Sequence, residues 1–426
     1  MSELTAERIK EAVDDRAGAI VEWTKALVRF ASENRPPDGD EADVQLHLAE
    51  QCRALGLEVD LFSPQEMAGA AEHPFWLAGR DYSRGRKNLA ARWRGVGGGR
   101  SILLSGHSDV APSDPAEWTV CPPYEPVVRD GRLYGRGSAD MKGGLAAAFW
   151  AVRVLRELGF APRGDVLFES VVDEEYASGN GTLAARLKGY NADLAVVTEP
   201  TGMEVCPACF GAFLGDLRLT GKGGMPYTGD AIANPLVGAA RAVELLYEFQ
   251  THWRQRNRHE LFDGPGKELN VLAWRIENGA GGQTVQMGTP REVSVSWIVW
   301  CHPGMTEEHF YPEFQAYWEG KRKTEPALEP FDLALEKTYH SVRPWETSRD
   351  DPAIAAVARA AEAVRGSAVV SGAPFSCDLG VYGEIGRMPS VLFGPRGGNL
   401  HGVDEWVSIR DVLDLTATLA TLIKDL

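Results

Sequence analysis

The chain has 426 residues, enough for two or three domains at roughly 150 residues each, so a fibrous protein and a miniprotein are both excluded. Hydrophobic residues make up 44% and charged residues 24%, which is typical of folded globular proteins and argues against large-scale disorder. The formal net charge of −16 would repel a polyanion, so nucleic acid is not an expected partner.

The N-terminal sequence MSELTAERIK lacks the basic start and the apolar core of a secretory signal, which favours a cytoplasmic location. No run approaches the roughly 18 apolar residues of a membrane-spanning helix, so we expect no membrane association. The 6 cysteines are scattered along the chain, and this argues against a disulfide framework.

The first half of the chain has the pattern of an α/β sheet. Helices are expected first, because apolar side chains recur at helical spacing near the N-terminus, and short β-rich runs then alternate with helical stretches. The expected helices are 5–31, 41–55 and 143–158, and the expected strands are 57–62, 88–93, 101–105, 165–172 and 192–198. Ligand sites in such sheets lie at the carboxyl ends of strands.

From about residue 211 the pattern changes to that of a compact α+β module. The expected strands there are 212–220, 269–276 and 292–300, and the expected helices are 236–249 and 307–319. We therefore predict a second domain, 211–325, inserted into a first domain formed by 1–210 and 326–426. The first domain resumes with helix 351–365, the apolar run 390–393 and helix 409–424.

The strongest local signal is the segment SILLSGHSDV at 101–110. His107 and Asp109 are two residues apart at the end of an apolar strand, so their side chains share a face. A metal-binding imidazole needs an acceptor for its second nitrogen, and this carboxylate or a neighbouring backbone group can supply it. On its own, such a pair is usually structural.

Further acidic residues and a late histidine follow other predicted elements. Asp140 lies after a glycine-rich turn at the start of a helix, where it could cap the helix or bridge two cations. Glu174 and Glu175 end an apolar strand, and both can serve one site only if the strand has ended there, the alternative being a solvated acidic turn. Glu199 follows another apolar strand, and His401 ends a Gly/Pro-rich loop.

Together these residues provide the ligands for two divalent metal ions at the strand ends of one predicted sheet. Nitrogen and oxygen ligands without a thiolate suit Zn, Mn or Co. The sequence has no G-x-S-x-G elbow, no P-loop and no H-E-x-x-H motif. It therefore gives little support to a serine hydrolase, a nucleotide-binding loop or a zinc protease of the H-E-x-x-H type.

The sequence resembles the peptidase M20 family of dinuclear metallohydrolases over nearly the whole chain. The family motifs occur in family order as GHSDV (106–110), DGRLYGRGSADMKGG (130–144), DEE (173–175), TEP (198–200) and GPRGGNLHGVDE (394–405). The resemblance implies an α/β fold: a mixed-sheet metallohydrolase catalytic domain with an inserted α+β, ferredoxin-like lid domain that forms a homodimer.

The resemblance also assigns the metal ligands. His107 and Glu199 would bind one metal ion, Glu175 and His401 the other, and Asp140 would bridge them. The cofactors would be two divalent ions, Mn or Zn, and the substrate a small molecule.

The remaining catalytic roles come from the same resemblance. Asp109 would orient His107, and Glu174 would be the general base. The peptide bond after Asp140 would be cis.

Three lid positions depart from the family. The family's lid histidine is replaced by Met225 or a neighbour in GKGGMPYT (221–228), and its lid asparagine falls in TVQ (284–286). The lid arginine is replaced by Trp300 or Cys301. A thioether cannot donate a hydrogen bond, so either another donor assists amide hydrolysis or the substrate differs.

Within the family the chain most resembles the branch of 5-nitroanthranilate aminohydrolases. This implies hydrolytic deamination of an activated aromatic amine, such as 5-nitroanthranilate, to 5-nitrosalicylate and ammonia. The alternatives are an N-acyl amino acid amidohydrolase or carboxypeptidase, and a non-catalytic metal-binding protein. The presence of Glu174, which chemistry needs more than metal binding does, counts against the last.

Candidate substrate contacts lie outside the metal motifs. Ser376 and Asp378 belong to the segment APFSCD (373–378), which resembles the family's Gly-Gly-Thr-Asp stretch. Arg396 precedes His401 in its loop. The other candidates are the lid residues Met225 and Tyr227.

Overall fold

The computed structural model describes residues 4–176, 179–225, 229, 231–278 and 288–426. The chain divides into two compact units. The first comprises Met1–Ala208, Glu346–Ala373 and Cys377–Leu426, and the second comprises Cys209–Trp345 and Pro374–Ser376.

The first unit is built around a mixed sheet with the strand order β16-β9-β5-β8-β4-β3. Neighbours from β16 to β8 are parallel, whereas β4 pairs antiparallel with both β8 and β3. The strands are β3 (Glu58–Phe62), β4 (Asn88–Trp93), β5 (Ile102–His107), β8 (Val166–Val171), β9 (Ala195–Val197) and β16 (Ser390–Leu392). Every residue of β5 and β8 is buried, as expected of central parallel strands.

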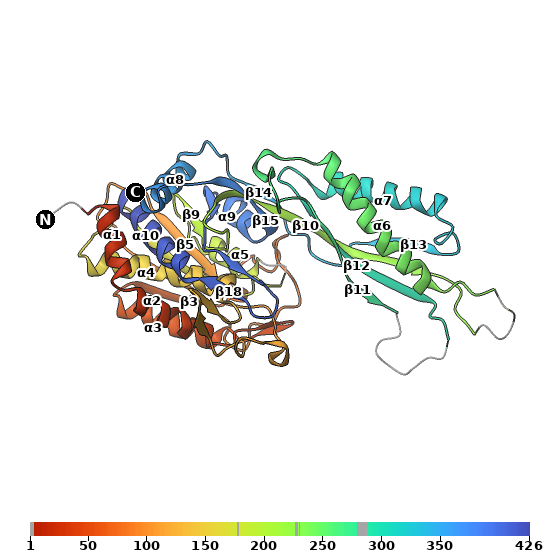
Figure 1. The fold of residues 1–426 in the computed structure, drawn as a ribbon, viewed down its shortest axis with the longest axis horizontal. Helices are drawn as coiled ribbons and strands as arrows, with labels where there is room; N and C mark the ends of the chain where they lie inside the picture. Colours follow the sequence, from red (N-terminus) through yellow and green to blue (C-terminus); the bar gives the residue numbers. More distant parts are fainter. Residues whose placement is uncertain (1–3, 177–178, 226–228, 230, 279–287) are drawn as a thin grey trace. The chain divides into compact units, whose positions relative to one another are not determined.

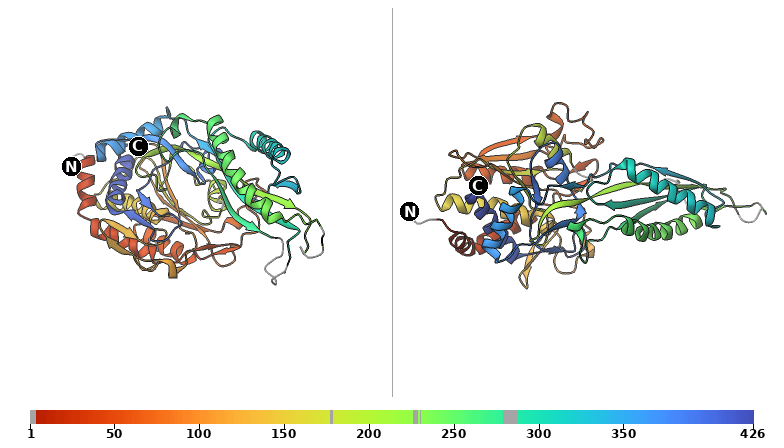
Figure 2. Two further views of the ribbon diagram at one scale, coloured as in Figure 1. Left: turned by 45° about the vertical axis from the view of Figure 1, so that its right-hand side comes forward. Right: turned by 90° about the horizontal axis from the view of Figure 1, so that it is seen from above.

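Helices surround this sheet and supply most of the core. Their bounds are α1 (Ala6–Asp14), α2 (Ala17–Val28), α3 (Ala42–Ala54), α4 (Gly143–Glu157), α5 (Asn180–Leu187), α8 (Pro352–Arg365), α9 (Leu379–Glu384) and α10 (Ile409–Asp425). The alanine-rich helix α4 packs closely against α10 (Figure 1). Helices from opposite ends of the sequence, α1 and α10, lie side by side, red and blue in Figure 2.

Short strands bring two motif-bearing loops of the first unit together. The strands are β6 (Val127–Arg129), β7 (Arg132–Tyr134), β17 (Gly397–Gly398) and β18 (Trp406–Ser408), in the order β17-β18-β7-β6. Because β7 precedes Asp140 and His401 lies between β17 and β18, this pairing places both residues at one end of the unit. The remaining strands are the two-residue β1 (Asn34–Arg35), β2 (Asp38–Gly39) and β14 (Trp345–Glu346), and the seven-residue β15 (Val370–Ser376).

The described part of the second unit has the order β-α-β-β-α-β of a ferredoxin-like module. Its elements are β10 (Val205–Thr220), α6 (Pro235–Arg256), β11 (Val271–Glu277), β12 (Glu292–Cys301), α7 (Glu307–Thr324) and β13 (Asp332–Glu336). The strands form an antiparallel sheet in the order β11-β12-β10-β13. Trp297 of β12 packs on Phe310 and Phe314 of α7, which covers this face of the sheet (Figure 1).

The mixed α/β fold class predicted from the sequence is confirmed, although some element bounds differ. The second unit extends to Trp345, beyond the predicted limit of 325, because β13 pairs with β10. Strand β10 begins at Val205, earlier than the strand expected from 212. Among the described residues, no helix combines the length and the apolar character that crossing a membrane requires.

Candidate metal centre

Three neighbouring parallel strands of the first unit end beside one another. His107 is the last residue of β5 and pairs with Val171, the last residue of β8. Asp173 follows with a left-handed φ of 71°, which ends the strand and lets Glu174 and Glu175 serve the same site. Glu199 lies two residues after the end of β9 at Val197. The predicted convergence at the carboxyl edge of the sheet is therefore present in the structure.

The His107 ring faces three carboxylates. Its Nε2 atom lies 3.1 Å from Asp140 Oδ1, 3.7 Å from Glu199 Oε1 and 4.0 Å from Glu174 Oε2. The His107 side chain is 1% exposed, so these groups meet where water screens charge poorly.

The His401 ring faces the same bridging acid from the other side. Its Nε2 atom lies 3.2 Å from Asp140 Oδ2 and 2.8 Å from Glu175 Oε2. Each oxygen of Asp140 thus points to a different histidine. A carboxylate placed between two imidazoles, each with a further carboxylate nearby, is a donor set that fits two divalent cations.

Asp109 lies behind His107 and acts on it through the backbone. His107 Nδ1 lies 2.9 Å from the carbonyl oxygen of Asp109, whereas the nearest carboxylate oxygen is 3.6 Å away. With the proton on Nδ1, Nε2 is free to bind a metal. The Asp109 carboxylate instead accepts the backbone N–H groups of Glu174 at 3.2 Å and Glu175 at 2.9 Å.

Glu405, which the sequence analysis did not single out, holds the loop that carries Asp140. Its Oε1 atom accepts the N–H groups of Ala139 at 2.9 Å and Asp140 at 3.1 Å. Its Oε2 atom accepts Gly137 N–H at 2.9 Å and Arg136 Nη1 at 2.8 Å. Glu405 ends the motif at 394–405, yet nothing in the local pattern distinguishes it from a surface acid. The Asp140–Met141 peptide bond is cis.

Burial and close neighbours shift the ionisation of the cluster. Burial raises the pKa of the Glu174, Glu175 and Glu199 carboxyls, and nearby carboxylates add to this effect. Burial also opposes ionisation of Asp140, but hydrogen bonds from the two histidines outweigh it and lower the pKa of that carboxyl. Hydrogen bonds to Asp140 and Glu175 raise the pKa of His401 to about 11. The cluster therefore favours positive charge at its centre.

The predicted substrate contacts are scattered. Asp378 is buried in the first unit, accepts a hydrogen bond from the Thr182 hydroxyl and raises the pKa of Glu174. Arg396 Nε lies 3.3 Å from Asp411 Oδ2 on α10, and its side chain is 64% exposed. Ser376 is half-buried and belongs to the second unit.

The lid positions are only partly described. Met225, Trp300 and Cys301 belong to the second unit, where Met225 and Trp300 are half-buried and Cys301 is buried. Tyr227 and the segment 284–286 lie outside the described residues.

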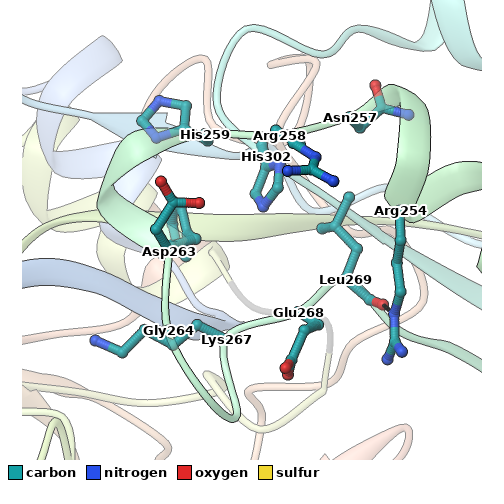
Figure 3. A pocket seen from close by; sticks show the side chains of 11 residues that line it. Arg254, Asn257, Arg258, His259, Asp263, Gly264, Lys267, Glu268, Leu269 and His302 are labelled. Carbon is teal, nitrogen blue, oxygen red and sulfur yellow. Dashed lines mark hydrogen bonds between the residues drawn. The ribbon is translucent and has the colours of Figure 1, made fainter.

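A cavity of about 350 Å³ in the second unit also contains histidines and acids (Figure 3). His259, His302, Asp263 and Glu268 line it. Neither ring nitrogen of the buried His302 has a hydrogen-bond partner in the described part of the chain. In that same part, both groups of side chains able to hold a metal ion contain His107. We therefore place the candidate centre at His107, and not at this cavity.

Comparisons with known proteins place the chain in one family of hydrolases. The model of "Peptidase family M20/M25/M40" matches residues 103–425, which include every metal ligand predicted above. The chain is 26% identical to N-formyl-4-amino-5-aminomethyl-2-methylpyrimidine deformylase of Halalkalibacterium halodurans, over 98% of this chain and 97% of that protein. It is 29% identical to succinyl-diaminopimelate desuccinylase of Cupriavidus pinatubonensis, over 76% of this chain and 82% of that protein. The solved dipeptidase Dug1p of Saccharomyces cerevisiae shares the fold, with a TM-score of 0.79 at 14% identity over 98% of each chain.

Proposed function

Because the chain belongs to peptidase family M20/M25/M40, and is thus a metal-dependent hydrolase of amide or peptide C–N bonds, we propose that it removes a small acyl group from a small-molecule amide. The observation that carries the proposal is Asp140, whose oxygens lie 3.1 Å from His107 Nε2 and 3.2 Å from His401 Nε2. Such an arrangement suits a carboxylate that bridges two metal ions.

We assign His107 and Glu199 to one ion, Glu175 and His401 to the other, and Asp140 to both. The ligands are nitrogen and oxygen only, which suits either Mn or Zn. Divalent ions held there would polarise the amide carbonyl and make water more acidic.

Glu174 is the proton carrier in this proposal. Its side chain is 13% exposed and lies 4.0 Å from His107 Nε2, so it borders the centre and still reaches solvent. Burial raises the pKa of its carboxyl, which makes the carboxylate a stronger base. Glu174 takes a proton from the attacking water as the C–O bond forms, and gives it to the leaving nitrogen as the C–N bond breaks. The products are a carboxylic acid and an amine, which exchange the remaining proton to give a carboxylate and an ammonium ion.

The comparisons favour small acyl groups as substrates. The deformylase relative matches along almost its whole length, whereas the desuccinylase relative is covered to 82%. We therefore propose an N-formyl amine, with the formylated aminomethylpyrimidine as the first substrate to test and an N-succinyl amino acid as the second.

Hydrolytic deamination of an activated aromatic amine is the second candidate reaction. The family's lid histidine is replaced by Met225 or a neighbour, and a methionine cannot donate a hydrogen bond to the oxyanion of amide hydrolysis. A reaction that passes through no carbonyl oxyanion would not need that donor. The relatives compared above lend this reaction no support, and it stays a prediction that ammonia release would test.

The lid role of the second domain is also a proposal. We propose that the ferredoxin-like module, predicted as 211–325, forms a homodimer and covers the substrate. Light scattering on the purified protein would give the mass of one chain or two, and a monomer at every concentration would contradict it.

The deciding experiment reconstitutes the metal-free protein with Mn²⁺ or Zn²⁺ and measures formate, succinate and ammonia from the respective substrates. We expect formate release that depends on metal, and a kcat reduced about 10²- to 10⁴-fold in Glu174→Gln, which keeps the bound metal. Ammonia from 5-nitroanthranilate without acyl release would replace the acyl proposal by deamination. An activity that survives unchanged in Glu174→Gln would refute the role of this residue.

A further inference from the structure

A buried amide lies directly behind the Asp109 carboxylate. Asn34 is 3% exposed, and its Nδ2 atom donates to Asp109 Oδ2 at 2.8 Å and to Asp173 Oδ1 at 3.1 Å. Its Oδ1 atom accepts a hydrogen bond of 2.5 Å from Arg80 Nη2. A flipped amide would turn its oxygen to two carboxylates and its NH₂ group to a guanidinium, so only one orientation is compatible with these partners.

The groups around Asn34 are themselves held in place. Asp173 accepts hydrogen bonds from Arg80 and Arg86, and from the Tyr82 hydroxyl at 2.6 Å. Arg86 also pairs with the fully buried Glu41 at 2.7 Å. These two arginines balance the charges of Asp173 and Glu41, which leaves the charge of Asp109 to other partners.

The hydrogen-bond partners of Asp109 connect it to the candidate metal centre. Besides the Asn34 amide, the Asp109 carboxylate accepts the N–H groups of Glu174 and Glu175, at 3.2 and 2.9 Å. The backbone of Asn34 is tied to the same strand end, because its N–H donates to the Val110 carbonyl at 3.0 Å. Asp109 therefore stands between Asn34 on one side and the turn that bears two site carboxylates on the other.

We propose that Asn34 is a positioning residue of the metal centre, because it fixes the Asp109 carboxylate and thereby the backbone of Glu174 and Glu175. This inference rests on the proposed function, which makes Glu175 a metal ligand. Without the Asn34 amide, the carboxylates of Asp109 and Asp173 would face each other with no donor between them. Asp109 would then turn away and release the two N–H groups that it holds.

The test compares Asn34→Leu with Gln45→Leu. Gln45 is a second buried amide of the first unit, and its Nε2 atom donates to a backbone carbonyl, that of Ser170, at 2.9 Å. Both substitutions remove a buried amide, but only the first removes a donor to Asp109. The measurements are Zn²⁺ affinity by competition with a chromophoric chelator, the visible spectrum of the Co²⁺-loaded protein, and thermal unfolding of the metal-free protein.

We expect Asn34→Leu to weaken Zn²⁺ binding about 10- to 100-fold and to alter the Co²⁺ spectrum. Gln45→Leu should lower the unfolding temperature while the affinity and the spectrum stay as in the wild type. If Asn34 only supported the core, its substitution would likewise lower the unfolding temperature and leave the Zn²⁺ affinity and the Co²⁺ spectrum unchanged. Wild-type affinity and spectrum in Asn34→Leu would therefore overturn the proposal.

Where Asn34→Leu does not fold, Asn34→Ala and Gln45→Ala replace the pair, since alanine removes the amide without adding bulk. Zn²⁺ affinity and the Co²⁺ spectrum of the alanine variants are then compared in the same way. A wild-type protein that binds no Zn²⁺ refutes the proposed metal centre, and with it this role of Asn34. Wild-type-like Asn34 variants in a protein that binds metal and turns over substrate refute the role of Asn34 alone.

Discussion

Two sets of histidines, one in each unit, differ in what surrounds them. His401 meets carboxylate oxygens at 2.8 and 3.2 Å, and hydrogen bonds to these acceptors raise its pKa to about 11. Burial, with a smaller contribution from the nearby His259, lowers the pKa of His302 to about 4. One environment holds a positive charge and the other excludes it. A buried histidine in a cavity therefore does not identify a reactive centre, whereas convergent acceptors do.

Replacing His401 and His302 in turn by phenylalanine tests this difference most directly. His401→Phe removes a proposed metal ligand, so we expect Zn²⁺ affinity at one site to fall at least about 100-fold. His302→Phe should leave Zn²⁺ affinity unchanged, because no carboxylate in the described residues joins His302 in a metal-binding group. Isothermal titration with Zn²⁺ measures both. An equal loss in the two variants would mean that the second unit contributes to metal binding.

Glu405→Gln tests whether the loop of Asp140 needs its buried acceptor. The carboxylate accepts from three backbone N–H groups and from Arg136. A glutamine would keep one oxygen and turn an NH₂ group towards two of these donors, so the loop should shift. We expect metal affinity to fall about 10- to 100-fold, as for other residues that orient ligands.

The matched control is Glu268→Gln in the cavity of the second unit, which should leave metal affinity within the error of the titration. A wild-type affinity in Glu405→Gln would mean that the loop keeps its shape without this carboxylate.

The sequence could predict the proposed ligands because each follows a strand or a loop with a recognisable pattern. His107, Asp140 and Glu175 each lie in a short motif, and parallel strands bring their ends together in any sheet of this kind. The supporting residues had no such signal. Asn34 is 75 residues from Asp109, and Glu405 is 265 residues from Asp140, so only the folded chain shows that they touch.

The bounds of the second domain were hard to predict for the same reason. The segment 332–336 alternates only weakly, and what makes it a strand is its pairing with β10, over a hundred residues earlier in the chain. Strand propensity depends on such partners more than on the segment itself. The extension of the second unit beyond 325 therefore depends on a strand pairing that the local sequence does not show.

The smallest expected effect concerns the pH dependence of stability. The folded pKa of His302 is about 4, below the ordinary histidine value of 6.5. Between these values the unfolded chain binds a proton that the folded chain does not, so stability falls as the pH is lowered through this window. His302→Phe removes this contribution. Between pH 7 and pH 5, the wild type should lose on the order of 1–2 kcal/mol more unfolding free energy than the variant.

Urea unfolding of the metal-free proteins at both pH values measures this difference. Other groups titrate equally in both proteins, so the difference isolates His302, whose charged neighbour Asp263 opposes the shift without cancelling it. If wild type and His302→Phe lose the same free energy, the pKa of His302 is the same in the folded and unfolded chains. The contrast with His401 would then rest on geometry alone.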